Sequence, residues 1–139
     1  MSNKFATGPF QVPLFATGGI PADLNINVLN VILKNHSDEE RTVQVKVEKC
    51  LTAVFPATST EEELLSETVE LNKGECTVLQ VSILPNDILR VEVQGEIEED
   101  LEKMEICVTG GNSLNPGDGF IQFAEATMFF RHGNFLKSG

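Results

Sequence analysis

The chain has 139 residues, of which 41% are hydrophobic, and a formal net charge of −11. This length suits one domain, and this apolar content excludes a chain that is disordered throughout. Because an acidic surface repels phosphate groups, the charge argues against nucleic acids and anionic membranes as partners. No apolar run approaches the roughly 20 residues of a membrane-spanning helix, and no secretory signal is evident. We therefore expect neither membrane insertion nor conventional secretion.

The first 22 residues are apolar and nearly uncharged, with Lys4 as their one charged side chain. Within KFATGPFQVPLFATGG, residues 4–19, the side chains of Phe5, Phe10 and Phe15 are evenly spaced. The acidic residues all follow this segment. We expect an extended N-terminal connector over residues 1–22 and a folded domain over residues 23–139.

Two prolines and two glycines suggest how this connector is built. Pro9 and Pro13 lack amide donors and favour an extended chain, which suits a segment laid along a groove. Gly18 and Gly19 then provide a hinge before the first strand of the domain. Three interpretations stay open: a disordered leader, a first strand of the chain's own sandwich, and a segment that docks into a neighbouring subunit.

Energy estimates show what the connector requires. Burying three Phe side chains contributes roughly 5–9 kcal/mol, whereas fixing ~15 backbone residues costs about 15–30 kcal/mol. The segment therefore needs main-chain partners or surrounding subunits in order to be held. The candidate docking residues are Phe5, Pro9, Phe10, Val12, Leu14 and Phe15.

From residue 23 the sequence turns into short β-type runs separated by turn-forming residues. Residues 25–34 are apolar on both faces, which predicts a central strand, and residues 41–50 alternate apolar with polar, which predicts a strand with one solvated face. Residues 51–55 are a short strand or a bulged continuation that ends at Pro56. We interpret residues 57–67 as an acidic loop.

The second half of the chain continues the pattern. Residues 67–71 and 75–83 flank an Asn-Lys-Gly turn, which predicts a hairpin. Residues 88–98 and 104–110 alternate, and residues 119–135 are long enough for one bent strand or two. About eight short strands and no convincing helix predict an all-β fold: an antiparallel β-sandwich, immunoglobulin-like or jelly-roll.

Few side chains suggest catalysis. His36 and His132 lack the Ser, Cys or Asp context of a nucleophile site, and no phosphate-binding glycine loop or HExxH motif occurs. The chain also has no Trp or Tyr, the rings on which sugar-binding surfaces depend. We expect no enzymatic activity, no metal site and no cofactor.

Cys50, Cys76 and Cys107 are too few and too far apart for a tetrahedral metal site. Three interpretations stay open. They are buried free thiols of a β core, or one cross-strand disulfide with a free thiol, or they include a thiol that pairs between subunits.

A small β-sandwich without a signal peptide, behind an extended N-terminal connector, resembles the endospore appendage (spore pilus) subunits of Bacillus-type bacteria. GPFQVP, residues 8–13, is also similar to leader peptides that attach proteins to the exosporium. The resemblance implies a connector inserted into the preceding subunit and a fibre on the spore surface, released when the mother cell lyses. Disulfide-linked members of that family carry Cys in the connector, whereas residues 1–49 here contain none.

We therefore expect a structural subunit of a self-assembling extracellular fibre, a pilus or appendage at the cell or spore surface. Its partners would be copies of itself and, on the spore, surface-anchoring proteins. A head-to-tail contact whose rotation does not close builds a filament, which here would be held by burial and strand pairing. The alternatives are a non-fibrous spore coat, exosporium or shell protein, and a small β-sandwich binding module.

Overall fold

The computed structural model describes residues 3–13, 25–97, 103–118, 121 and 123–137. These residues form strands and one short 3-10 turn. The elements are β1 (Asn3–Ala6), β2 (Phe10–Gln11), β3 (Val28–Asn35), β4 (Arg41–Cys50), β5 (Glu62–Leu71), β6 (Cys76–Ser82), β7 (Ile88–Gly95), β8 (Met104–Asn112), β9 (Phe123–Arg131), η1 (His132–Asn134) and β10 (Leu136–Lys137).

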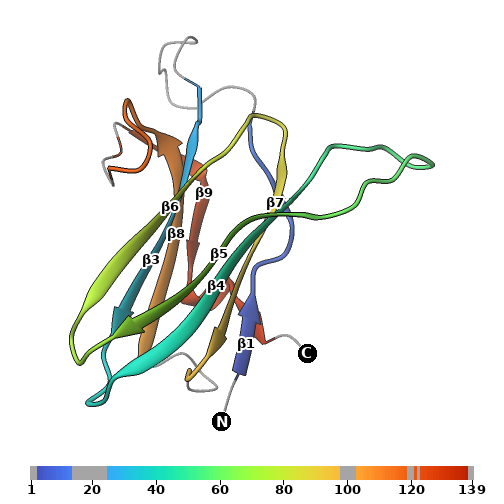
Figure 1. Cartoon of the computed structure of the whole chain (residues 1–139). Coiled ribbons are helices and arrows are strands. Elements are labelled where there is room, and N and C mark those ends of the chain that lie inside the picture. The colour runs from blue at the N-terminus through green and yellow to red at the C-terminus, as the bar shows by residue number, and fades with distance from the viewer. Residues whose placement is uncertain (1–2, 14–24, 98–102, 119–120, 122, 138–139) are drawn as a thin grey trace.

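Two antiparallel sheets face each other, as Figure 1 shows. In sheet A the strand order is β10-β1-β7-β4-β5, and β2 also pairs with β7. In sheet B the order is β6-β3-β8-β9. The all-β antiparallel sandwich expected from the sequence is therefore confirmed. The described residues contain no helix with the length and hydropathy that crossing a membrane requires.

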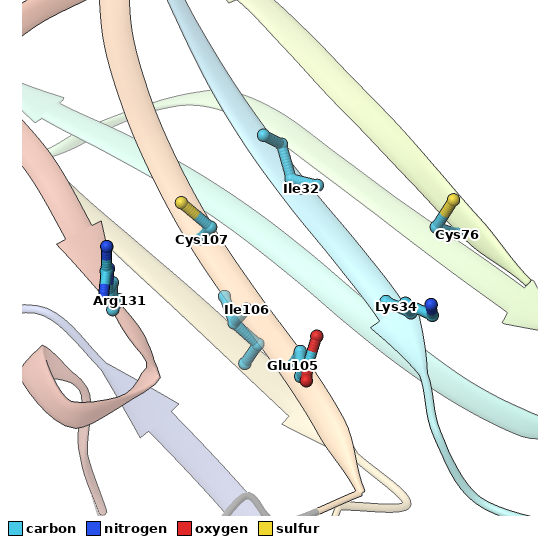
Figure 2. A pocket seen from close by; sticks show the side chains of 7 residues that line it. All are labelled: Ile32, Lys34, Cys76, Glu105, Ile106, Cys107 and Arg131. Carbon is cyan, nitrogen blue, oxygen red and sulfur yellow. The ribbon is translucent and has the colours of Figure 1, made fainter. Parts of the chain in front are cut away.

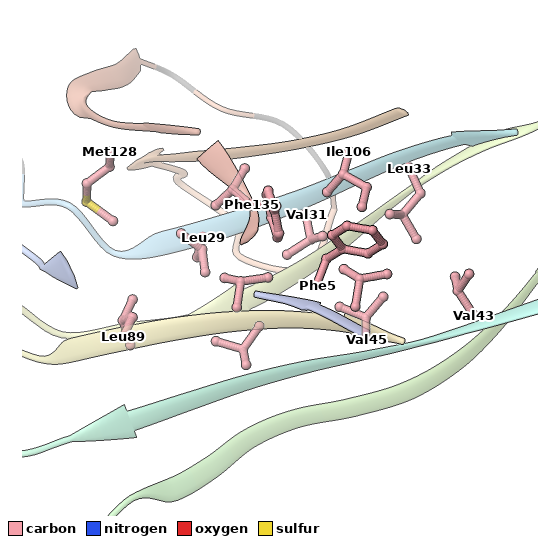
Figure 3. Close-up of a cluster of buried hydrophobic side chains, with 14 of the residues drawn as sticks. Phe5, Leu29, Val31, Leu33, Val43, Val45, Leu89, Ile106, Met128 and Phe135 are labelled. Carbon is pink, nitrogen blue, oxygen red and sulfur yellow. The ribbon is translucent and has the colours of Figure 1, made fainter. Parts of the chain in front are cut away.

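Strand β4 shows how alternation builds the core. Val43, Val45 and Val47 are buried, whereas the residues between them are half-buried on the outer face of sheet A. The strand spans the residues that the pattern predicted. In Figure 3, Val43 and Val45 lie across the core from Val31 and Leu33 of sheet B.

Strand β3 is central, as its two apolar faces predicted, because it pairs with both β6 and β8. Even its outward-facing Asn30 is buried. The backbone amide of Gly117 donates to the Gln80 side chain, and the Gln80 amide donates to Asn30 Oδ1 at 2.8 Å. The loop around residue 117 therefore covers one end of the outer face of sheet B.

The expected hairpin of residues 67–71 and 75–83 is wrong. Strand β5 pairs with β4 in sheet A, and β6 pairs with β3 in sheet B. The turn between them passes from one sheet to the other, so Val69 and Leu79 pack against the core from opposite layers. Turn residues signal a reversal of the chain but do not say which strand each flank will pair with.

Two further expectations need correction. Residues 51–55 form no strand, and β5 begins at Glu62, inside the acidic loop expected over residues 57–67. The early start continues the pairing with β4, in which Leu65 lies opposite Val47 and Glu62 opposite Lys49. Near the C-terminus, the described part of residues 119–135 forms one strand, β9, and the 3-10 turn η1, and β10 follows beyond that stretch.

Candidate functional site

The N-terminal segment lies along β7 of its own sheet. Asn3–Ala6 pair with Gly95–Glu92 in register, and Phe10 and Gln11 pair with Leu89 and Ile88 near the other end of the same strand. The backbone of Val12 continues this alignment, since its amide donates to the Asp87 carbonyl at 2.8 Å. Residues 3–12 thus run beside the whole length of β7.

Between β1 and β2 the ladder is interrupted, and a side chain repairs it. The Thr7 amide donates to the Val91 carbonyl at 2.9 Å, and the Val91 amide donates to Thr7 Oγ1 at 3.0 Å. The hydroxyl thus takes the place of a main-chain acceptor. Pro9 lies in this interruption and is exposed, so its missing amide leaves no buried group unpaired.

The apolar side chains of this segment enter the chain's own core. Phe5 is 3% exposed and Val12 is fully buried. Phe10 is half-buried, and its ring centroid lies 4.5 Å from that of Phe130. Figure 3 shows Phe5 between the two sheets, where it contributes to the core that both layers share.

The extended connector is therefore not what the described part of the N-terminus forms. Residues 3–13 are part of sheet A, which matches the interpretation of the segment as a first strand of its own sandwich. The main-chain partners that the energy estimate required are supplied by β7. The other expected docking and hinge residues, Leu14, Phe15, Gly18 and Gly19, lie outside the described residues, as does the expected boundary at residue 22.

The outer face of sheet A carries a network of charges around a buried carboxylate. Lys4 Nζ lies 3.4 Å and Arg90 Nη1 3.6 Å from Glu92 Oε1, and Arg90 also lies 3.8 Å from Glu48. These two cations compensate for the burial of Glu92. A hydrogen bond with Glu61, followed by burial and by the Glu61 charge, raises the pKa of Glu48.

A projecting loop between β4 and β5, residues 51–61, is the feature that the sequence reasoning missed. We call it the arm; Figure 1 shows it extending away from both sheets. Its apolar side chains are exposed: Val54 at the tip is 79% and Phe55 88% accessible, and Leu51 at the start of the arm is 65% accessible. The signal was present as LTAVFPAT, an apolar run beside a turn-forming Pro that lacks the alternation of a strand.

Hydrogen bonds hold the arm in shape. At the tip, the Ala57 amide donates to the Val54 carbonyl at 2.9 Å and closes a turn. Farther back, Ser59 Oγ donates to the Leu51 carbonyl at 2.7 Å. At the base, the Thr52 hydroxyl donates to the Asn86 carbonyl. The arm is thus a hydrogen-bonded loop whose apolar tip, Val54 and Phe55, is exposed.

A second surface feature lies on the outer face of sheet B, where Figure 2 shows it. We call it the groove; its volume is about 400 Å³. Its walls come from β3, β6, β8 and β9. The lining residues are Ile32, Lys34, Cys76, Glu105, Ile106, Cys107 and Arg131.

All three cysteines are free thiols, so the cross-strand disulfide is not seen. The interpretation as buried free thiols of a β core is also wrong, because Cys76 is exposed and Cys50 and Cys107 are half-buried. Cys76 and Cys107 lie on opposite sides of β3 in the groove (Figure 2). Burial raises the pKa of the Cys107 thiol, an effect that the nearby charge of Arg131 partly offsets.

Of the two histidines, the structure describes the side-chain contacts of His36 alone. His36 Nε2 lies 2.9 Å from Glu105 Oε1, at the turn that leaves β3, and His132 begins η1. Across the part of the chain that the structure describes, no three His, Cys, Asp or Glu side chains converge as metal ligands would.

Comparison with known proteins gives little to add to this geometry. No protein-family model matches the sequence, and no match is found among curated proteins. A solved structure, the crystal structure of Thermotoga maritima 1070, aligns over 93% of this chain and 89% of its own, with 9% identity and a TM-score of 0.46. A likeness of this degree establishes neither a shared fold nor a shared function.

Proposed function

We propose that this chain is a structural subunit that assembles with copies of itself, as in an extracellular fibre at the cell or spore surface. The observation that carries the proposal is the arm. Soluble monomers rarely keep a contiguous group of large apolar side chains fully exposed, and such groups mark protein contacts. Val54 and Phe55 are adjacent in sequence and exposed on a projecting, hydrogen-bonded loop, and Leu51 of the same loop is also exposed.

The N-terminal segment offers a second way to join subunits. A terminal segment that completes its own sheet can complete the same sheet in another copy with the same contacts, which is the basis of strand exchange. Here β1 and β2 lie along β7, and Phe5 and Val12 fill the core. Docking of residues 3–13 into a neighbour would therefore take the form of exchange.

Assembly is tested by light scattering of the full-length chain over a hundredfold range of concentration. We expect the weight-average mass to exceed that of a monomer of 15.2 kDa and to rise with concentration. A constant monomeric mass at every concentration would refute the proposed function. A discrete, closed oligomer would favour a shell protein over a fibre.

Exchange is tested by a designed disulfide between Lys4 and Gln94, which face each other in the register of β1 and β7. The variant Lys4→Cys with Gln94→Cys is made in a background in which the three natural cysteines are replaced by Ser. Exchange predicts a ladder of covalent multimers on non-reducing gels. A cross-link confined to the monomer would show that each chain keeps its own β1, and would leave the arm as the assembly element.

A further inference from the structure

The arm and the groove lie in different parts of the molecule and have complementary properties. The tip of the arm presents Val54 and Phe55, both almost fully exposed. The groove presents an apolar floor at Ile32 and Cys107 and has a volume of about 400 Å³, which is within the range of clefts that bury a whole ligand. The groove therefore has room for an aromatic side chain, and the tip of the arm carries one, Phe55, that is almost fully exposed.

Charge around the two features is also complementary. Where the arm joins β5, the chain carries the acidic run Glu61, Glu62 and Glu63. The rim of the groove carries the cations Lys34 and Arg131. The groove's one acid, Glu105, is engaged by His36, whose Nε2 lies 2.9 Å from its carboxylate. In a chain of net charge −11, two cations beside an apolar hollow favour an acidic apolar partner.

A chain cannot place its arm in its own groove. The groove lies where β3 ends and β6 and β8 begin, next to the turn that leads into β4. The arm starts only after β4 has run its ten residues to the other end of the sandwich, a distance of about 33 Å at ~3.3 Å per residue. The partner that fits both the hollow and the charges is therefore a second copy.

We propose that the arm of one copy docks into the groove of the next. Phe55 then lies against Ile32 and Cys107, and the acidic run of residues 61–63 lies beside Lys34 and Arg131. The two surfaces differ, so the contact is heterologous, and it builds a filament when its rotation does not close. This inference rests on the proposed function, because it supplies the contact through which the subunits assemble. In this arrangement the groove thiols Cys76 and Cys107 lie at a boundary between subunits.

The test places a thiol on the arm beside Phe55 and asks which natural thiol it reaches. Val54→Cys is combined with Cys50→Ser in the full chain, which is oxidised and digested for mass spectrometry. Leu114→Cys is the control, because Leu114 is 70% exposed on a different loop. We expect intermolecular disulfides from position 54 to Cys107 or Cys76, in at least tenfold greater yield than from position 114.

Two results would overturn the docking arrangement. Equal yields from positions 54 and 114 would show that the arm has no preferred site. A disulfide that joins only the introduced thiols of two copies would show that the arms meet each other symmetrically.

A second pair of variants separates this inference from the proposed function. Phe55→Asp places a charge at an exposed tip, so the fold is retained and only the contact changes, and Phe55→Leu keeps the tip apolar. If the wild type assembles and Phe55→Asp lowers the assembled fraction at least tenfold while Phe55→Leu does not, the docking is supported. If Phe55→Asp assembles as well as the wild type, the docking is wrong and the proposed function stands. If the wild type does not assemble, the proposed function itself fails.

Discussion

The N-terminal segment and the arm are both apolar stretches that include a proline, yet the structure treats them in opposite ways. Phe5 is 3% exposed, whereas Phe55 is 88% exposed. The difference lies in the backbone, because residues 3–12 find main-chain partners along β7 and residues 53–58 find them only within their own turn. Apolar side chains enter the core where the main chain is already paired. Without that pairing they remain at the surface, available to another molecule.

The largest difference in stability is expected when Phe is replaced by Asp in each of the two regions. Phe5→Asp places a charge in the core, and because truncating a buried Phe alone costs about 3–5 kcal/mol, the variant should unfold or lose most of its stability. Phe55→Asp should leave the free energy of unfolding within about 0.5 kcal/mol of the wild type, as expected for an exposed site. Circular dichroism during thermal unfolding measures both. A stable Phe5→Asp variant would mean that β1 is not part of the core.

Because the N-terminal segment is part of the core, deleting it should affect the stability of the fold as well as any assembly. Removal of residues 1–18 takes away two strands and the core side chains Phe5 and Val12. The remaining body should therefore be less stable, and loss of assembly in such a truncation would not by itself identify a docking segment.

A second contrast compares a glycine at the end of β7, where β7 lies close to β4, with a glycine between β1 and β2. Gly95 has φ +145°, and a Cβ there would lie 2.5 Å from the Thr42 carbonyl oxygen of β4. Gly95→Ala should cost about 1–3 kcal/mol because the backbone must move. Gly8→Ala, in the interruption between β1 and β2, meets nothing within 4 Å and should be nearly neutral. Urea unfolding of the two variants measures the difference, and equal stabilities would show that β7 does not approach β4 as described.

A third contrast compares two threonine hydroxyls. Thr7 is buried and accepts the Val91 amide, so Thr7→Val leaves a buried donor unpaired and should cost about 1–3 kcal/mol. Thr52 braces the base of the arm but is exposed, so Thr52→Val should change the free energy of unfolding by about 0.5 kcal/mol or less. Denaturant unfolding gives both values. A larger loss at Thr52 would make the arm, rather than the N-terminal segment, the part on which the fold depends.

The smallest effect concerns Glu48, which lies between the two regions and pairs with Glu61 of the arm. A pKa raised above 4.5 means that the folded state holds this proton more tightly than the unfolded chain does. The free energy of unfolding therefore falls as pH rises from the unfolded pKa through the folded one. Glu48→Gln should lack this loss and should be more stable than the wild type at neutral pH. Thermal unfolding at pH 4 and pH 7 tests the sign, and a variant less stable at pH 7 would reverse it.

Local patterns predicted the strands better than they predicted the connections between them. The alternation of residues 41–50 located β4, and the two apolar faces of residues 25–34 located a central strand, because each pattern reflects burial of that strand alone. The pairing of β5 with β4 rather than with β6 depends on the whole sandwich, so the Asn-Lys-Gly turn could not reveal it. The short β10, which pairs with β1 across the termini, has no local signal at all.

The candidate surfaces were also only partly predictable, because each depends on contacts between distant parts of the chain. Phe5, Phe10 and Val12 were recognised as residues in need of partners, but the sequence did not say that the partner was β7 of the same chain. The groove joins residues from four strands, so no stretch of sequence contains it. The arm was visible in the sequence as an apolar run. Its exposure depends on where β5 begins, and the pairing of β5 with β4 sets that start.

Negative-stain electron microscopy of the purified full-length chain beside Phe55→Asp tests the central claim most directly. The account predicts filaments from the wild type and discrete folded particles from the variant. Discrete monomers from both would contradict self-assembly, and filaments of the same length and number from both would contradict the role of the arm.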